Sequence, residues 1–263
     1  MSRLTSRRAA AGVVLACALV LALAAMAAAE VTQRNGLRVT FDGKMTPQKL
    51  PRTGSAPIAV AVGGTMESID GSLPPQLRRI TIGINRNGLI DSTGLPVCEM
   101  HQIQPATTRN ALQTCGPSIV GEGHFSAKIL LPEQSPFPSE GKIFAFNGTY
   151  KGQPAILAHV YGTEPAPTSV TLPFQILRSK GTFGTTLTAS LPRVTNKWGY
   201  VTGLEMTLQR RYSYRGKRRS FISAACPAPA GFPGAVFPLA RASYDFAGEQ
   251  PISSTLVRTC KVR

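Results

Sequence analysis

The residues Ile80-Thr81-Ile82-Gly83-Ile84-Asn85 decide the fold class of this chain. Isoleucine alternates with small or polar residues, and the two faces of a β-strand alternate with the same period of two. Asn87-Gly88 follows almost at once, and this pair favours a tight turn. The stretch therefore predicts a half-buried strand in an antiparallel sheet.

Runs of similar character occur along the whole chain, separated by turn-forming residues. The 263 residues include 25 Gly and 21 Pro, and only 16% are charged, which is typical of a β-protein with many turns. A short helix is expected only over Thr107–Leu112. The other predicted strands are Ile58–Val62, Phe125–Leu131, Lys142–Phe146, Ala155–Tyr161, Ser169–Leu177, Thr185–Leu191, Leu204–Tyr214, Arg218–Ala225, Ala240–Phe246 and Ser253–Val257. The fold class is therefore expected to be all-β.

The segment Gly162-Thr163-Glu164-Pro165-Ala166-Pro167 divides these strands into two groups. Its two prolines resist regular structure, so residues 163–168 are predicted to be a linker. Each group contains two strands followed by a pair of cysteines, a parallel that a duplication would explain. We therefore predict two tandem domains of the antiparallel β-sandwich type, residues 57–162 and 169–263, after a polar N-terminal arm over residues 30–56. A single larger sandwich is the alternative.

The first 29 residues have the pattern of a secretory signal peptide. Arg3, Arg7 and Arg8 precede an uncharged run over residues 9–29, which ends on three alanines. Cleavage after Ala29 would leave 263 − 29 = 234 residues, secreted or in the extracytoplasmic cell envelope. An uncleaved anchor is the alternative, because this run is long enough to cross a bilayer core of about 30 Å.

Four cysteines would remain in the exported chain: Cys98, Cys115, Cys226 and Cys260. An even number in an oxidising compartment indicates two disulfides, for which four cysteines permit three connectivities. We predict that sequence neighbours pair, as Cys98–Cys115 and Cys226–Cys260. A metal site is the competing interpretation, but the chain has no C-x-x-C and its three histidines have no known ligand spacing. We therefore expect no metal and no cofactor.

The segments around the first cysteine pair resemble a family of exported proteins. Leu95-Pro96-Val97-Cys98, then Cys115, then Ile119-Val120-Gly121-Glu122-Gly123 are similar to uncharacterised secreted proteins of high-GC soil actinobacteria. Residues 51–71 and 74–98 look similar too, so the resemblance covers most of the mature chain. It implies an exported location and no known activity.

Positive charge is concentrated in one segment of the second half. The formal net charge of the chain is +16. Removal of the signal peptide with its three arginines would leave (29 − 3) − 13 = +13. The segment interleaves cations and tyrosines: Arg210, Arg211, Tyr212, Tyr214, Arg215, Lys217, Arg218 and Arg219. A hairpin turning near Arg215-Gly216-Lys217 would hold them on one ribbon, which suits phosphate contacts and stacking. The alternative is a solvated edge hairpin whose charges prevent aggregation between sheets.

This basic segment suggests anionic partners outside the cytoplasm, namely envelope polymers or a lipid surface. Nucleic acid is a less favoured partner, because the chain contains no recognised nucleic-acid motif. No specific protein partner is predicted.

Catalytic patterns are scarce. The chain has no G-x-S-x-G, no H-E-x-x-H and no phosphate loop. Glu122 and His124 would share one face of a strand, where a carboxylate and an imidazole could transfer protons, but an exposed strand face is the simpler interpretation. We therefore expect no catalytic residues, and an exported, non-catalytic envelope-associated protein that binds anionic polymers or surfaces through a basic face. The alternative is an envelope-directed hydrolase of a polysaccharide or other polymer.

Overall fold

The computed structural model describes residues 29–164, 166–192 and 198–263. The expected signal peptide, residues 1–29, lies outside the described residues except for its last alanine. In the described ranges, no helix combines the length and the apolar character that crossing a membrane requires.

Most of the described chain belongs to one 14-stranded sheet. Its strands lie side by side in the order β1, β2, β5, β14, β9, β10, β11, β12, β13, β6, β18, β19, β3, and β8 pairs with β10. The bounds are β1 Glu30–Arg34, β2 Leu37–Thr46, β3 Lys49–Leu50, β5 Ala59–Ser68, β6 Leu77–Asn85, β8 Cys98–Glu99, β9 Ile119–Ile129, β10 Phe137–Tyr150, β11 Gln153–Gly162, β12 Thr168–Arg178, β13 Phe183–Ser190, β14 Gly199–Leu208, β18 Gly234–Phe246 and β19 Ile252–Val262. The sheet is mixed, because β8 with β10 and β3 with β19 are parallel pairs whereas the rest are antiparallel.

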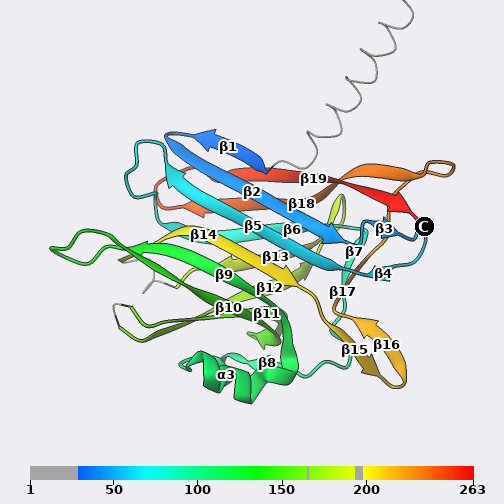
Figure 1. Cartoon of the computed structure of the whole chain (residues 1–263), viewed down its shortest axis with the longest axis horizontal. Coiled ribbons are helices and arrows are strands. Elements are labelled where there is room, and N and C mark those ends of the chain that lie inside the picture. Colours follow the sequence, from blue (N-terminus) through cyan, green and yellow to red (C-terminus); the bar gives the residue numbers. More distant parts are fainter. Residues whose placement is uncertain (1–28, 165, 193–197) are drawn as a thin grey trace, which may run out of the picture.

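The sheet curls until β19 lies against β1 and β2 (Figure 1). The hydroxyl oxygens of Thr32 and Ser254 are 3.2 Å apart across this junction. Buried Arg258 on β19 donates through Nε to the carbonyl oxygen of Gly43 at 2.7 Å and through Nη2 to Asp42 at 2.6 Å. These side-chain contacts close the curl, so the inner face of the sheet surrounds an apolar core.

Strands from both halves of the sequence alternate in this sheet. β14 lies between β5 and β9, and β6 lies between β13 and β18. One core cluster accordingly contains Phe41 and Ile80 from the first half together with Leu187 and Phe237 from the second. The two-domain sandwich is therefore not confirmed, whereas a mostly β fold is. The segment expected to be a linker joins β11 to β12, which are antiparallel neighbours.

The prediction of a polar arm over residues 30–56 is wrong. These residues form β1, β2, β3 and the start of a short strand, β4 (Ala56–Pro57). In β2, the side chains of Leu37, Val39 and Phe41 are buried, and the residues between them lie on the other face. A half-buried strand has a polar average composition, so only its period-two alternation reveals it.

Two short helices, α2 (Met100–Ile103) and α3 (Thr108–Cys115), make contacts with β10 and β11. The hydroxyl of Thr107 accepts a hydrogen bond from the amide of Asn110 at 3.2 Å, which caps α3. The predicted short helix is thus confirmed. A second small core, which includes Ile103, Phe146 and Leu157, lies between these helices and the sheet.

Both predicted disulfides are confirmed. The Cα atoms of Cys98 and Cys115 are 5.6 Å apart, and this bond ties β8 to the last residue of α3. The Cα atoms of Cys226 and Cys260 are 5.7 Å apart, and this bond ties a loop to β19.

Two smaller sheets lie at one end of the large one, on the right of Figure 1. Strands β4, β17 (Ile222–Ala224) and β7 (Gly88–Ile90) form the first. Strands β15 (Arg211–Tyr214) and β16 (Lys217–Ser220) form the second, a two-stranded ribbon. The expected continuous strands over residues 204–214 and 218–225 are therefore each divided in two, because the chain leaves the large sheet to make this ribbon.

Candidate functional site

The basic segment forms the hairpin that the sequence predicts. Arg215 and Gly216 form its turn, with φ values of 50° and 72°. Positive φ at both central residues is the requirement of a type I′ turn, whose twist matches that of the two strands. Tyr214 pairs with Lys217 beside the turn, and Arg211 pairs with Ser220 at the base.

Four cations of the hairpin are exposed: Arg211, Arg215, Lys217 and Arg218. Because neighbouring strand residues point to opposite faces, Arg218 and its partner Ser213 share one face with Arg211. Lys217 lies on the other face and Arg215 at the tip. The exposed charge is thus spread around the ribbon.

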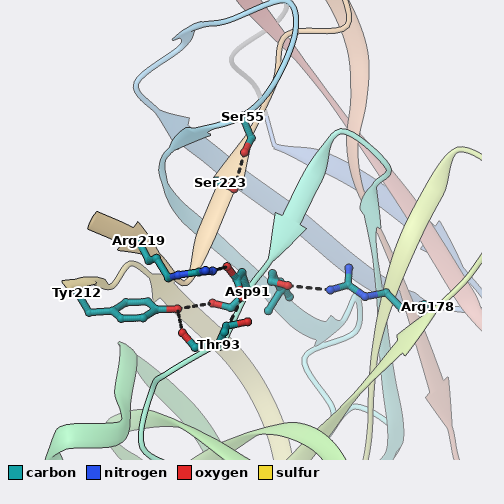
Figure 2. A network of polar contacts seen from close by, with 8 residues as sticks. Ser55, Asp91, Thr93, Arg178, Tyr212, Arg219 and Ser223 are labelled. Carbon is teal, nitrogen blue, oxygen red and sulfur yellow. Dashed lines mark hydrogen bonds and ion pairs between the residues drawn. The ribbon is translucent and has the colours of Figure 1, made fainter. Parts of the chain in front are cut away.

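The remaining two cations are committed to the protein itself. Nη1 of Arg219 is 2.8 Å from Oδ2 of Asp91, and both side chains are about a third exposed or less (33% and 26%) (Figure 2). Nη2 of Arg210 is 3.5 Å from the carbonyl oxygen of Pro117. Both arginines are only half-exposed, so they contribute less to a binding surface than the sequence suggested.

The two tyrosines pack against the loop that follows β7. The hydroxyl of Tyr212 is 3.2 Å from the carbonyl oxygen of Asp91 and 2.9 Å from that of Thr93. A Cβ on Gly94 would lie 2.2 Å from a ring carbon of Tyr214, so only glycine allows this ring to approach so closely. The tyrosines therefore fix the direction of the hairpin, and neither is the free stacking platform that we expected.

Asp91 is the residue that sequence reasoning missed at this site. Its carboxylate accepts a hydrogen bond from the amide of Thr93 at 3.0 Å, which forms a turn. The sequence indicates this turn, but no sequence pattern links Asp91 to Arg219. Although partial burial opposes the effect, hydrogen bonds from Thr93 and the guanidinium of Arg219 lower the pKa of Asp91. Burial, helped by the charge of Asp91, raises the pKa of Tyr212. The base of the hairpin is therefore an ion pair whose acid stays ionised.

Further polar contacts join neighbouring segments close to this ion pair. Nη2 of Arg178 donates to the carbonyl oxygen of Ile90 at 2.7 Å, and the hydroxyls of Ser55 and Ser223 are 3.2 Å apart (Figure 2). The hairpin thus projects from a cross-linked base.

Glu122 and His124 share the outer face of β9, as the sequence predicts, and both are exposed. They line a groove of about 890 Å³ together with Glu205 of β14 and Lys142 of β10. His124 lies directly between Glu205 and Lys142 in the sheet register. Glu122 is a diagonal neighbour of Glu205, which corresponds to a separation of roughly 7–8 Å across antiparallel strands. This groove is the candidate place for the hydrolase alternative.

A metal is not indicated at either place. Within residues 29–164, 166–192 and 198–263, no group of three or more His, Cys, Asp or Glu side chains is arranged to hold an ion.

His159 is fully buried on β11, and neither imidazole nitrogen makes a hydrogen bond. Burial lowers its pKa from 6.5, and the backbone of Ile103 opposes this only in part. The folded protein therefore holds the neutral form, whereas the unfolded chain binds a proton as the pH falls below 6.5. By linkage, the contribution of His159 to stability is complete above pH 6.5 and is lost progressively below it.

We expect the free energy of unfolding to fall between pH 7.5 and pH 5.5, by at most about 1.4 kcal/mol per pH unit from this single group. His159→Leu should reduce this dependence relative to the parent protein. Urea unfolding of both proteins at the two pH values measures the difference. An unchanged pH dependence in His159→Leu would contradict the assignment.

No family model, no curated protein and no solved structure matches this chain. Function is therefore inferred from geometry and charge.

Proposed function

We propose that this chain is an exported, non-catalytic protein of the cell envelope that binds anionic polymers through the tip and faces of the β15–β16 hairpin. The binding groups are the side chains of Arg211, Arg215, Lys217 and Arg218. Their positive charge attracts phosphate or carboxylate groups along a polymer, and each contact releases counterions from it.

One observation carries this proposal: four exposed cations project on a ribbon whose base is fixed. Among the described residues, none of the four belongs to an ion pair. The Asp91–Arg219 pair and the contacts of Tyr212 hold the ribbon in one direction. A polymer would therefore meet charges that are already oriented, which reduces the entropy lost on binding.

Two further features support the envelope as the place of action. Two disulfides are stable in an oxidising compartment outside the cytoplasm and are rare inside it. The net charge of the mature chain, (29 − 3) − 13 = +13, would draw it to the anionic polymers and lipids found there.

Replacing Arg211, Arg215, Lys217 and Arg218 together with glutamine should weaken binding to purified teichoic acid by about tenfold or more at low salt. The plot of log affinity against log salt should also become less steep, because fewer counterions are released. Fluorescence anisotropy over a salt series measures both quantities. The fold should survive, since exposed charges contribute little to stability.

The matched control replaces four exposed lysines elsewhere, Lys44, Lys49, Lys128 and Lys180, with glutamine. It lowers the net charge equally but leaves the hairpin intact. If both variants bind equally weakly, net charge alone attracts the polymer and the hairpin is not the site. Anionic vesicles and DNA, tested in parallel, show whether teichoic acid is preferred.

A further inference from the structure

The interior of the curled sheet is not completely filled. Several apolar side chains that point inward are only partly buried, among them Val62, Ile82, Leu204 and Met206. They line a cavity of about 100 Å³. Well-packed interiors contain few voids larger than one water molecule, so this cavity is a feature of the fold to be explained.

The lining of the cavity is mainly aliphatic and aromatic, and none of its side chains is charged. The two asparagines in the lining already have partners. Nδ2 of Asn85 donates to the carbonyl oxygen of Pro238 at 2.8 Å, and Nδ2 of Asn87 donates to Oδ1 of Asn85 at 2.8 Å. A charged ligand group inside would lose its hydration without compensation, so the lining selects an uncharged, apolar molecule.

One polar group in the lining is unpaired. Tyr244 is only 5% exposed, and its hydroxyl makes no hydrogen bond within the part of the chain that the structure describes. Buried tyrosine hydroxyls usually find a partner. A Cβ on Gly64 would lie 2.5 Å from the carbonyl oxygen of Thr40 and 3.0 Å from this hydroxyl, so only glycine lets the hydroxyl lie this close to β5. Burial raises the pKa of Tyr244, which keeps the phenol protonated and able to donate.

We propose that this cavity binds the alkyl chain of an uncharged lipid-like molecule, with one oxygen of the ligand accepting a hydrogen bond from Tyr244. A dry apolar cavity of about 150 Å³ is known to bind benzene, so a cavity of this order holds a short alkyl segment. This site lies inside the sheet and does not depend on the hairpin or on its anionic partners.

The probe is 1-hexanol, which has an alkyl chain and one neutral oxygen. Met45, Met66 and Met206 line the cavity, whereas Met100 packs in the separate small core under the helices. In NMR spectra of protein labelled with ¹³C in the methionine methyl groups, hexanol should shift the three cavity resonances and leave that of Met100 in place. Equal shifts at all four, or none, would overturn the proposal.

The role of the Tyr244 hydroxyl is tested by removing the oxygen first from the protein and then from the ligand. Tyr244→Phe should weaken the binding of 1-hexanol by roughly three- to tenfold, the effect of one hydrogen bond, and leave the binding of n-hexane unchanged. A general change in packing would affect both ligands alike, and this result would refute the hydrogen bond.

The location of the alkyl chain is tested by filling the cavity. Val62→Phe should abolish the hexanol-induced shifts, whereas Val257→Phe, the same change at an exposed position on β19, should not. Circular dichroism and the thermal midpoint establish that each variant is folded. If Val62→Phe does not fold, Ile82→Phe replaces it, and shifts that persist in a folded cavity variant would contradict the proposed site.

Discussion

Replacing Cys226 and Cys260 together with alanine is expected to lower the free energy of unfolding by about 4 kcal/mol. The two residues are 34 positions apart, and both are buried. Breaking their bond returns the conformational freedom of that loop to the unfolded chain. The bond also holds the loop after β17 against β19, the strand whose side chains close the curled sheet.

Urea unfolding of the variant and the parent protein under oxidising conditions measures this loss. The matched control removes Cys98 and Cys115, which are 17 positions apart and close a shorter loop worth about 3 kcal/mol. The control should also disturb mainly the small core beneath α2 and α3. A loss below about 1 kcal/mol for the Cys226–Cys260 variant would mean that the unfolded chain is little constrained by this bond.

Phe221→Ala is expected to lower the free energy of unfolding by about 3–5 kcal/mol, as large cavities in cores do. Phe221 is fully buried between β16 and β17. Its amide donates to the carbonyl oxygen of Arg210 at 2.8 Å, and its carbonyl oxygen accepts from the amide of Asp91 at 2.9 Å. The residue thus joins the base of the hairpin to the core, and its loss should loosen the orientation of the basic tip.

Two measurements separate these effects. Urea unfolding gives the loss of stability, and amide hydrogen exchange at Tyr212 and Arg219 reports local opening of the hairpin. Phe232→Ala, at a side chain that is 60% exposed, is the control and should change stability by less than about 0.5 kcal/mol. If Phe221→Ala behaves like this control, the hairpin is not supported through the core.

The sequence predictions that the structure confirms are mainly those that depend on residues adjacent in the sequence. The alternation of Ile80, Ile82 and Ile84 placed a strand correctly, and the Arg215-Gly216 turn placed the hairpin, because side-chain direction and turn conformation are local properties. The cysteine pairs were also predicted correctly, from an even number of cysteines and the pairing of sequence neighbours. β2 was missed although its alternation was present, because its polar residues dominate the average composition.

The chain by itself therefore determined a β-rich fold, two disulfides and a basic hairpin. The order of strands in the sheet was decided only by the tertiary structure, since any exposed strand edge can pair with many others and the choice depends on burying a common core. The same holds for the Asp91–Arg219 pair, which joins residues 128 positions apart, and for the cavity beside Tyr244 and Gly64. Both arise where distant strands meet, and no local pattern encodes which side chains will face one another there.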